Sequence, residues 1–371
     1  MTCDYAALAT LGVQGLSPYQ PGKPIDELAR ELGLAPDRIV KLASNENPLG
    51  PSPKAIEAVR RILPQLARYP DGNGFELKQK LAVRYGVKPE QLTLGNGSND
   101  VLELIARAFT EKGREIVYSQ HAFAVYPLVT QALGAQHVKV PARQWGHDLN
   151  AMAEAVTDNT AVIFIANPNN PTGTDVSRRE LEAFLDRIPE EVVVVLDEAY
   201  GEYIDDPDYP DGLALLDRYP NLVVTRTFSK AWGLAGLRVG FAVSSPAIAD
   251  VLNRVRQPFN VDTAALTAAV AVLDDADYLA ESVAVNRAGL RQLQAGLEKL
   301  TLDFIPSRAN FVAVDVGRDA QPVYEGLLQE GVIVRPVAAY EMPRHLRVSV
   351  GLESENARFL EALENVLRAQ S

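Results

Sequence analysis

Short apolar runs alternate with helical patterns from about residue 90 onward, and this alternation limits the folds that are open to the chain. The runs include LTLG, AVIFIA, VVVVL, LVVTRTF and VGFAVS. Nearly continuous apolar runs of this kind are typical of strands that are buried on both faces of a sheet. The helical patterns between them supply the layers that cover those faces. The sequence therefore predicts an α/β fold with a large, mostly parallel sheet.

A second, smaller α/β pattern follows the large one. After the last run of the large sheet the pattern changes to long helices, and shorter strands such as FVAVDV and LRVSVG then alternate with two further helices. The N-terminal segment is rich in proline, which is typical of an extended arm. We expect a large domain over residues 46–262. The arm, residues 1–45, and residues 263–371 together are expected to form a smaller domain.

Composition and charge exclude several classes of partner. The chain has 371 residues, of which 47% are apolar and 23% charged, so it is long enough for two cores. Its net charge is −12 and its isoelectric point is about 5.0. This balance argues against nucleic acid and anionic membranes as partners. An anionic ligand must therefore be bound by a local cluster of cations.

The sequence also argues against metal chemistry and secretion. Cys3 is the only cysteine, which excludes an intrachain disulfide and a cysteine-based metal site, and the four histidines do not have the HExxH spacing. No run approaches the ~20 apolar residues of a membrane span, and the first residues lack the basic and apolar regions of a signal peptide. We expect a cytoplasmic protein without a metal.

Polar residues follow four of the apolar runs, where ligands gather in open parallel sheets. After LTLG, the segment GNGSN places Gly97, Ser98 and Asn99 at a predicted helix start, whose N–H groups and dipole suit a phosphate. Simple capping by Ser98 or Asn99 is the alternative. After AVIFIA, the segment NPNNPTG presents Asn170 in a loop stiffened by prolines, although it can also be read as a plain turn.

The other two runs end in an acid and in a lysine. VVVVL is followed by Asp197 and Tyr200, and an acid in this position can also be a helix cap. LVVTRTF is followed by Ser229 and Lys230, with Arg238 eight residues after the lysine. Because a buried ammonium is costly, a lysine among apolar residues usually has a depressed pKa or a covalent partner. The alternative is a lysine whose stem packs on its neighbours while its head reaches solvent.

Together these groups match what pyridoxal 5′-phosphate requires of a protein. Its aldehyde forms a Schiff base with a lysine, and its ring nitrogen stays protonated beside a buried carboxylate. Its phenolic oxygen accepts from donors such as an amide and a tyrosine hydroxyl. Its phosphate suits a helix N-terminus and a forked arginine. The sequence therefore predicts this cofactor.

The chain resembles the fold-type I pyridoxal-phosphate aminotransferases, and more narrowly the histidinol-phosphate aminotransferases. The broader likeness rests on NPNNPTG, VVVLDEAYGEY and TFSKAWGLAGLRVG. The narrower likeness rests on LSPYQPGKP, LASNENPLGPSP, RYPDGN and RPVAAYEMPRHLRVSVG. The resemblance covers nearly the whole chain. It implies a large sheet of the seven-stranded type, a smaller α/β domain, a pyridoxal 5′-phosphate cofactor and a homodimer.

The resemblance also implies roles for individual residues. Lys230, Asp197 and Tyr200 match the catalytic positions: Lys230 would hold the cofactor as a Schiff base, and Asp197 would pair with the pyridinium nitrogen. Asn170 and Tyr200 would bond the phenolic oxygen. The positions that match the phosphate-binding residues are Gly97, Ser98, Asn99, Ser229, Arg238 and Tyr69, of which Tyr69 would come from the partner subunit.

Four further positions concern the cofactor ring and the substrate. Phe123 stands where the family usually has a ring-stacking tyrosine, so stacking is kept and a hydroxyl contact is lost; a core aromatic is the alternative. Arg347 matches the anchor for the substrate carboxylate or phosphate, with Arg335 and Tyr19 as helpers. The alternatives are a surface ion pair for Arg335 and simple packing of the arm for Tyr19.

The resemblance implies amino transfer between glutamate, which becomes 2-oxoglutarate, and imidazole acetol phosphate, which becomes histidinol phosphate, in histidine biosynthesis. Three alternatives stay open. An aromatic amino acid aminotransferase shares every cofactor residue, and a phosphothreonine decarboxylase also pairs arginines with a phosphate. A regulatory sensor on this fold needs a DNA-binding module, for which no stretch of the sequence is left.

Overall fold

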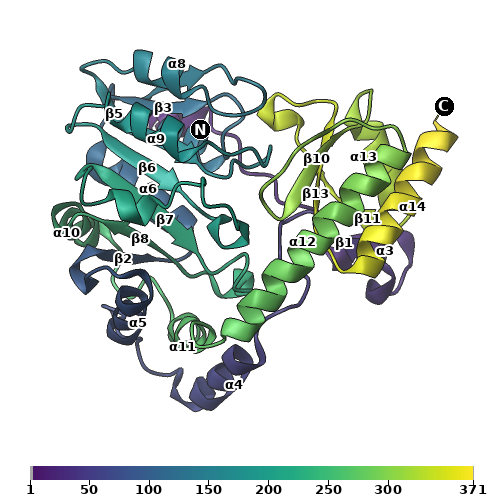
Figure 1. Cartoon of the computed structure of the whole chain (residues 1–371), viewed down its shortest axis with the longest axis horizontal. Helices are drawn as coiled ribbons and strands as arrows, with labels where there is room; N and C mark the ends of the chain where they lie inside the picture. Colours follow the sequence, from purple (N-terminus) through teal and green to yellow (C-terminus); the bar gives the residue numbers. More distant parts are fainter. Residues whose placement is uncertain (1–2, 371) are drawn as a thin grey trace.

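A seven-stranded mixed sheet forms the larger body of the molecule in the computed structural model, which describes residues 3–370 (Figure 1). In spatial order its strands are β2 (Leu92–Gly95), β8 (Gly240–Ser244), β7 (Leu222–Thr227), β6 (Val193–Asp197), β5 (Thr160–Ala166), β3 (Glu115–Ser119) and β4 (Gln136–Val140). The strands from β7 to β4 pair in parallel. The predicted α/β fold with a large, mostly parallel sheet is confirmed.

Strand β8 runs antiparallel to both of its neighbours. A parallel return requires a crossover, usually a helix, that carries the chain back along the sheet. The connection from β7 to β8 contains only the single turn η6 (Ala235–Leu237). The chain therefore turns back on itself, and this turn holds Lys230 and Arg238 at one edge of the sheet.

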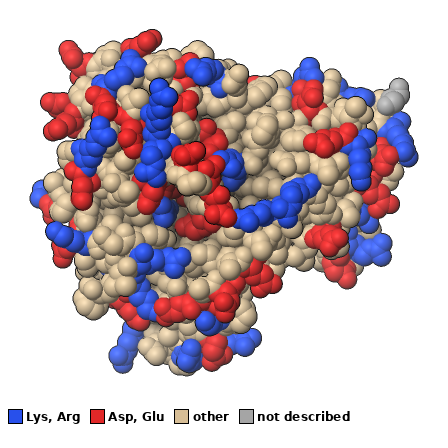
Figure 2. All heavy atoms as spheres, viewed as in Figure 1, with Lys and Arg blue, Asp and Glu red and all other residues tan. Residues whose placement is uncertain are grey.

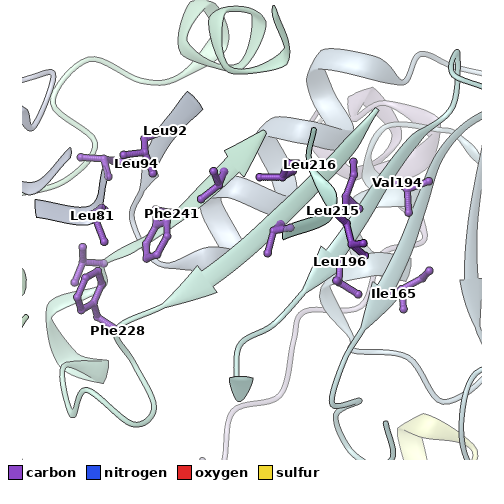
Figure 3. Close-up of a cluster of buried hydrophobic side chains, with 14 of the residues drawn as sticks. Leu81, Leu92, Leu94, Ile165, Val194, Leu196, Leu215, Leu216, Phe228 and Phe241 are labelled. Atoms are coloured by element: carbon purple, nitrogen blue, oxygen red, sulfur yellow. The ribbon is translucent and has the colours of Figure 1, made fainter. Parts of the chain in front are cut away.

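Helices cover both faces of this sheet because its strands are apolar on both sides. In β6, Val194 and Leu196 belong to one buried cluster, whereas Val193 and Val195 belong to another, as the two-residue period of a strand requires. Figure 3 shows the first cluster, in which Leu81, Leu92 and Phe241 pack near the β2–β8 edge. The helices around the sheet are α4 (Pro53–Ile62), α5 (Phe75–Tyr85), α6 (Ser98–Phe109), α7 (Val125–Ala132), α8 (Leu149–Glu154), α9 (Arg178–Leu185), α10 (Pro246–Val255) and α11 (Thr263–Val272).

A four-stranded antiparallel sheet forms the smaller body. Its order is β12 (Arg335–Pro336), β13 (His345–Ser349), β10 (Phe311–Asp315) and β9 (Phe304–Ile305). Helices α13 (Ala320–Gln329) and α14 (Glu353–Ala369) pack beside it, and the long helix α12 (Ala276–Lys299) extends from the larger body to the smaller one (Figure 1). The single-turn 3-10 helices elsewhere are η1 (Pro36–Arg38), η2 (Leu63–Gln65), η3 (Pro89–Gln91), η4 (Gly201–Tyr203), η5 (Gly212–Leu215) and η7 (Ala338–Tyr340).

The N-terminal arm contacts both bodies. Its short helices α1 (Tyr5–Leu8) and α2 (Leu11–Gln14) lie at the start, and α2 packs against α7 of the larger body. A side chain at Gly12 would lie 2.1 Å from the carbonyl of Gln131, so this contact requires glycine. Farther on, α3 (Ile25–Leu32) is followed by β1 (Val40–Lys41), which pairs in parallel with β11 (Val332–Ile333) of the smaller body.

Helix α11 lies beyond the predicted domain boundary at residue 262 but packs with the larger body. Ala265 and Ala268 are fully buried in the same cluster as the large sheet, and the helix lies against α4 and α5. An alanine-rich helix permits this close approach because its side chains are short. The division of the chain into two domains stays a prediction, and the packing favours a division after α11.

Charge is distributed without a dominant sign over the face in Figure 2, where basic and acidic side chains are interspersed. Within residues 3–370, no helix has the length and apolar character needed to cross a membrane. The described residues also include no group of three or more His, Cys, Asp or Glu side chains that could hold a metal ion. The cytoplasmic location stays a prediction from the sequence.

Candidate active site

A cavity of about 350 Å³ opens at the carboxyl ends of β5, β6 and β7, where the smaller body and the arm meet the large sheet. This is the edge at which ligands are expected in an open parallel sheet. The sequence-predicted residues that line it are Tyr19, Ser98, Asn99, Phe123, Asn170, Asp197, Tyr200, Ser229, Lys230, Arg238, Arg335 and Arg347. The fold therefore brings residues as far apart in the sequence as Tyr19 and Arg347 into one cavity.

Lys230 points into this cavity. Its ammonium donates to the backbone carbonyl of Ser44 at 3.2 Å and lies 5.8 Å from the centre of the Tyr200 ring. Burial, together with repulsion from the Arg347 guanidinium, lowers the pKa of Lys230 to about 7. The residue as a whole is half-buried and its head lies in the open cavity, so the alternative of a head that reaches solvent stays open. An amine that is about half neutral near pH 7 is suited to act as a nucleophile and as a base.

Asp197 is the last residue of β6 and is 4% exposed. Its two carboxylate oxygens accept from the hydroxyls of Tyr126, at 3.0 Å, and Thr225, at 2.9 Å. Burial raises the pKa of Asp197, and these two hydrogen bonds oppose the rise because they stabilise the charged form. Asp197 does not cap a helix: the short turn η4 that follows begins after Tyr200.

Tyr126 and Thr225 were missed in the sequence analysis. Thr225 lies directly beside Asp197 in the β6–β7 register, which periodicity alone does not specify. Tyr126 lies in α7, next to the segment that contains Phe123, and its ring stacks on Phe164 of β5. The signal for Tyr126 was its position in HAFAVYP, which the sequence analysis used only to identify Phe123.

Asn170 and Tyr200 each have one polar group engaged and another directed at the cavity. Arg347 donates to the Asn170 carbonyl oxygen Oδ1 at 2.5 Å, which leaves the Asn170 amide hydrogens as donors. The Asn45 amide donates to the Tyr200 hydroxyl oxygen at 3.0 Å, which leaves the hydroxyl proton as a donor. Burial raises the pKa of Tyr200 to about 12, so the hydroxyl keeps this proton at neutral pH.

An anion-binding cradle is formed at the start of α6. Gly97 occupies the N-cap position at a φ of 82°, and no side chain caps the first N–H groups, so the alternative of capping by Ser98 or Asn99 is wrong. A side chain at Gly97 would lie 2.3 Å from the Arg238 guanidinium. Arg238 donates to the Ser229 hydroxyl at 3.3 Å. Free N–H groups, a helix dipole and a guanidinium at one point suit a phosphate.

Two arginines lie directly opposite each other on β12 and β13. Arg335 and Arg347 are register partners, and neither has an ion-pair partner among the described residues. Arg347 is 5% exposed; it donates to the Ala43 carbonyl at 2.7 Å, while its Nε has no acceptor in the described structure. The alternative of a surface ion pair for Arg335 is wrong. Its guanidinium lies 5.2 Å from the Tyr19 ring and donates to the Gln20 carbonyl.

The remaining predicted residues differ in their relation to the cavity. Phe123 lines it and contacts Tyr126 edge to face. Gly97 contributes backbone at the cradle beside it. Tyr69 does not line it: its side chain is 83% exposed and stacks on Phe259. Its predicted contact with the cofactor phosphate of a partner subunit stays a prediction.

The residues of the cavity fit pyridoxal 5′-phosphate. An uncapped helix start beside Arg238 matches the phosphate, and the neutral amine of Lys230 matches the aldehyde. The buried carboxylate of Asp197 matches the ring nitrogen, and two free donors match the phenolic oxygen. The cation pair Arg335 and Arg347 is not used by these contacts, so it is available to a second anion.

Comparison with known proteins gives consistent matches over most or nearly all of the chain. The model of the aminotransferase class I and II family matches residues 37–363. A histidinol-phosphate aminotransferase 2 of Pseudomonas fluorescens is 64% identical over 367 residues, which cover 99% of each chain. The protein of the same name from Pseudomonas aeruginosa is 64% identical over 364 residues, which cover 98% of this chain and 99% of the relative.

A solved structure has the same fold. The crystal structure of histidinol-phosphate aminotransferase from Sinorhizobium meliloti in complex with pyridoxal-5′-phosphate superposes with a TM-score of 0.89. The two sequences are 30% identical, and the match covers 98% of each chain. The two bodies and the cavity between them are therefore the arrangement of an aminotransferase fold.

Proposed function

Because this chain belongs to the class I and II aminotransferase family, we propose that it transfers an amino group from glutamate to imidazole acetol phosphate, which yields histidinol phosphate and 2-oxoglutarate. The chain is a pyridoxal-phosphate-dependent aminotransferase. The names of its relatives and the two unpaired arginines of the cavity support this choice of substrate.

The cavity residues have complementary roles in this reaction. When bound, pyridoxal 5′-phosphate supplies an electron sink that makes the hydrogen on the substrate α-carbon acidic. Asp197 would hold a proton at the ring nitrogen, and Tyr126 and Thr225 orient its carboxylate. Asn170 and Tyr200 would donate to the phenolic oxygen. The start of α6, Ser229 and Arg238 would hold the phosphate group.

Lys230 would hold the cofactor through its amine until substrate binds and would then act as the base. Its free amine would take the proton from the substrate α-carbon and hand a proton back on the side of the cofactor. The lowered pKa of Lys230, about 7, supports this role because the neutral amine is then available at neutral pH. The same residue would return the protons in the second half-reaction. Because the first product leaves before the second substrate binds, the kinetics should be of the ping-pong type.

The pair Arg335 and Arg347 carries the choice of substrate. Like charges directly opposite each other on neighbouring strands destabilise a sheet unless an anion lies between them. The chain as a whole carries a net charge of −12, so it does not attract a phosphate ester at long range. Two guanidinium groups without ion-pair partners supply the local attraction, and their forked geometry suits a phosphate.

Arg335→Gln is expected to weaken the reaction with histidinol phosphate selectively. A charge-assisted hydrogen bond to a desolvated phosphate contributes about 1.5 to 3 kcal/mol, which corresponds to a roughly 10- to 150-fold loss of kcat/KM. Glutamate and phenylalanine, which lack the phosphate, should lose much less. The measurement is kcat/KM of the wild type and the variant with each of the three amino donors.

Two outcomes of this experiment contradict the proposal. An equal loss for all three donors removes Arg335 as a phosphate-selective residue. A wild-type kcat/KM that is higher for phenylalanine than for histidinol phosphate identifies an aromatic amino acid aminotransferase instead. Arg344→Gln is the matched control, because Arg344 pairs with Asp315 outside the cavity. Its kcat/KM should equal that of the wild type for every donor.

We also propose that the active enzyme is a homodimer in which Tyr69 completes the phosphate site of the partner subunit. The exposure of Tyr69 and its absence from the lining of its own chain's cavity support this arrangement. Mixing Lys230→Ala protein with Tyr69→Ala protein should restore up to about a quarter of the sites, because each hybrid dimer contains one intact site. Activity after mixing, refolding and dilution is the measurement.

A second mixture controls for nonspecific recovery. Lys230 and Asp197 lie in the same cavity of one chain, so mixing Lys230→Ala with Asp197→Asn creates no intact site. This mixture should stay inactive. Recovery in both mixtures, or a fully active monomer in sedimentation at assay concentration, contradicts the shared site.

A further inference from the structure

Asn45 is held in a conformation that few residues other than glycine adopt. Its backbone has a φ of 54°, in the left-handed region, and its side chain is 1% exposed. Asparagine tolerates this conformation better than most residues. The backbone carbonyl of Asn45 accepts from the Asn310 side chain at 3.0 Å. The strained conformation is therefore fixed by neighbours, and it places the amide of Asn45 beside Tyr200.

The hydrogen bonds of Ser349 fix which way the Asn45 amide faces. The Ser349 hydroxyl accepts from the backbone N–H of Asn45 at 2.8 Å and donates to the side-chain oxygen Oδ1 at 2.9 Å. Because Oδ1 is engaged with Ser349, the amide nitrogen Nδ2 faces Tyr200 and donates to its hydroxyl oxygen at 3.0 Å. The Tyr200 hydroxyl oxygen thus already accepts a hydrogen bond from Asn45.

We propose that Asn45, locked by Ser349, is a positioning residue that directs the Tyr200 proton onto the phenolic oxygen of the bound cofactor. The proposal rests on the proposed function, since it requires the cofactor at Lys230. A hydroxyl whose oxygen already accepts from a neighbouring amide turns its proton away from that amide. Among the described residues, no other hydrogen-bond partner engages the Tyr200 hydroxyl, which faces the cavity.

The position of Ser349 on β13 links the Tyr200 hydrogen bond to Arg347. Ser349 lies two residues after Arg347 on β13, so both side chains project from the same face of that strand. Arg347 holds Asn170, and Ser349 holds Tyr200 through Asn45. A strand of the smaller body therefore orients the Tyr200 donor that belongs to the large sheet. Strand β13 therefore positions both Arg347, the proposed substrate anchor, and the hydroxyl donor of Tyr200.

Asn45→Asp reverses the direction of the hydrogen bond without changing the size of the side chain. The introduced carboxylate accepts from the Tyr200 hydroxyl and withdraws its proton from the cavity, and aspartate tolerates the same backbone conformation. A donor on the phenolic oxygen stabilises its negative charge and lowers the pH at which the Lys230–cofactor chromophore loses its proton. The midpoint of this absorbance titration in the holoenzyme should rise by about one pH unit or more.

Two further variants separate positioning from general stability. Asn45→Gly removes the amide donor and fits the positive φ, and Ser349→Ala releases the amide; both should raise the midpoint, by less than Asn45→Asp. In a Tyr200→Phe background, Asn45→Gly and Ser349→Ala, which add no charge, should cause no additional shift. A merely structural role for Asn45 would give the same shift with and without the tyrosine hydroxyl.

Failure of the proposed function and failure of the role proposed for Asn45 give different results. If wild-type protein shows no cofactor absorbance that depends on Lys230, the proposed function fails. If the wild type titrates normally while Asn45→Asp, Asn45→Gly and Ser349→Ala all bind cofactor and keep the wild-type midpoint, the role of Asn45 is overturned and the proposed function stands. An additional shift caused by Asn45→Gly or Ser349→Ala in the Tyr200→Phe background also overturns it.

Discussion

Lys230→Ala is expected to abolish the covalent cofactor adduct that borohydride reduction traps in the wild-type protein. The neutral amine of Lys230 is the nucleophile that the cavity presents, and no second lysine lines the cavity within residues 3–370. Amino transfer should also fall by roughly 10²- to 10⁴-fold or more, because the variant loses its general acid and base. Mass spectrometry of the reduced protein and steady-state rates are the measurements.

Lys78→Met is the matched control for this experiment. Lys78 is also a buried lysine whose pKa is lowered by burial, but it lies outside the cavity and donates to Asn73 at 2.9 Å. Its replacement should leave the adduct in place. An adduct that persists in Lys230→Ala on a different lysine contradicts the assignment, whatever happens to the rate.

Asp197→Asn is expected to slow the removal of the substrate α-proton by roughly 10²- to 10³-fold, the effect of removing one partner of a buried charge pair. The amide keeps the shape of the carboxylate and can still accept from Tyr126 or Thr225. It does not carry the charge that holds a proton at the ring nitrogen. The measurement is the rate at which the α-hydrogen of glutamate exchanges with deuterium from solvent.

Glu202→Gln tests whether another acid whose pKa is raised by burial has this effect. Burial raises the pKa of Glu202, which accepts from the Trp232 indole at 3.3 Å and does not line the cavity. The exchange rate of this variant should match that of the wild type. An unchanged rate in Asp197→Asn would show that the ring nitrogen is protonated without help from this carboxylate.

Much of the fold follows from local patterns in the sequence. The apolar runs that became β5, β6 and β7 are buried on both faces, as their composition predicts, and polar residues that follow each run line the cavity. This correspondence arises because parallel strands all end at the same edge of the sheet. The antiparallel direction of β8 and the packing of α11 were not predicted. Both depend on contacts between distant segments.

The residues of the candidate site also differ in whether a local sequence pattern identifies them. Lys230, Asp197 and Asn170 could be identified because each lies in a short motif that ends an apolar run. Thr225 and Asn45 could not, because each acts on a residue in another element, whereas Tyr126 lies in a motif that was used only to identify Phe123. Thr225 depends on the register of two strands, and Asn45 depends on a left-handed backbone held by Asn310 and Ser349.

The sequence by itself determined the α/β class, the family, the cofactor and most of the chemical groups at the site, because these depend on residue types and their order within short segments. Only the tertiary structure decided how the groups are aimed. It set Arg335 opposite Arg347, engaged one side of the Tyr200 hydroxyl, and left Tyr69 outside the cavity of its own chain. Hydrogen-bond direction and the pairing of charges depend on atoms brought together from distant parts of the chain, which no local pattern specifies.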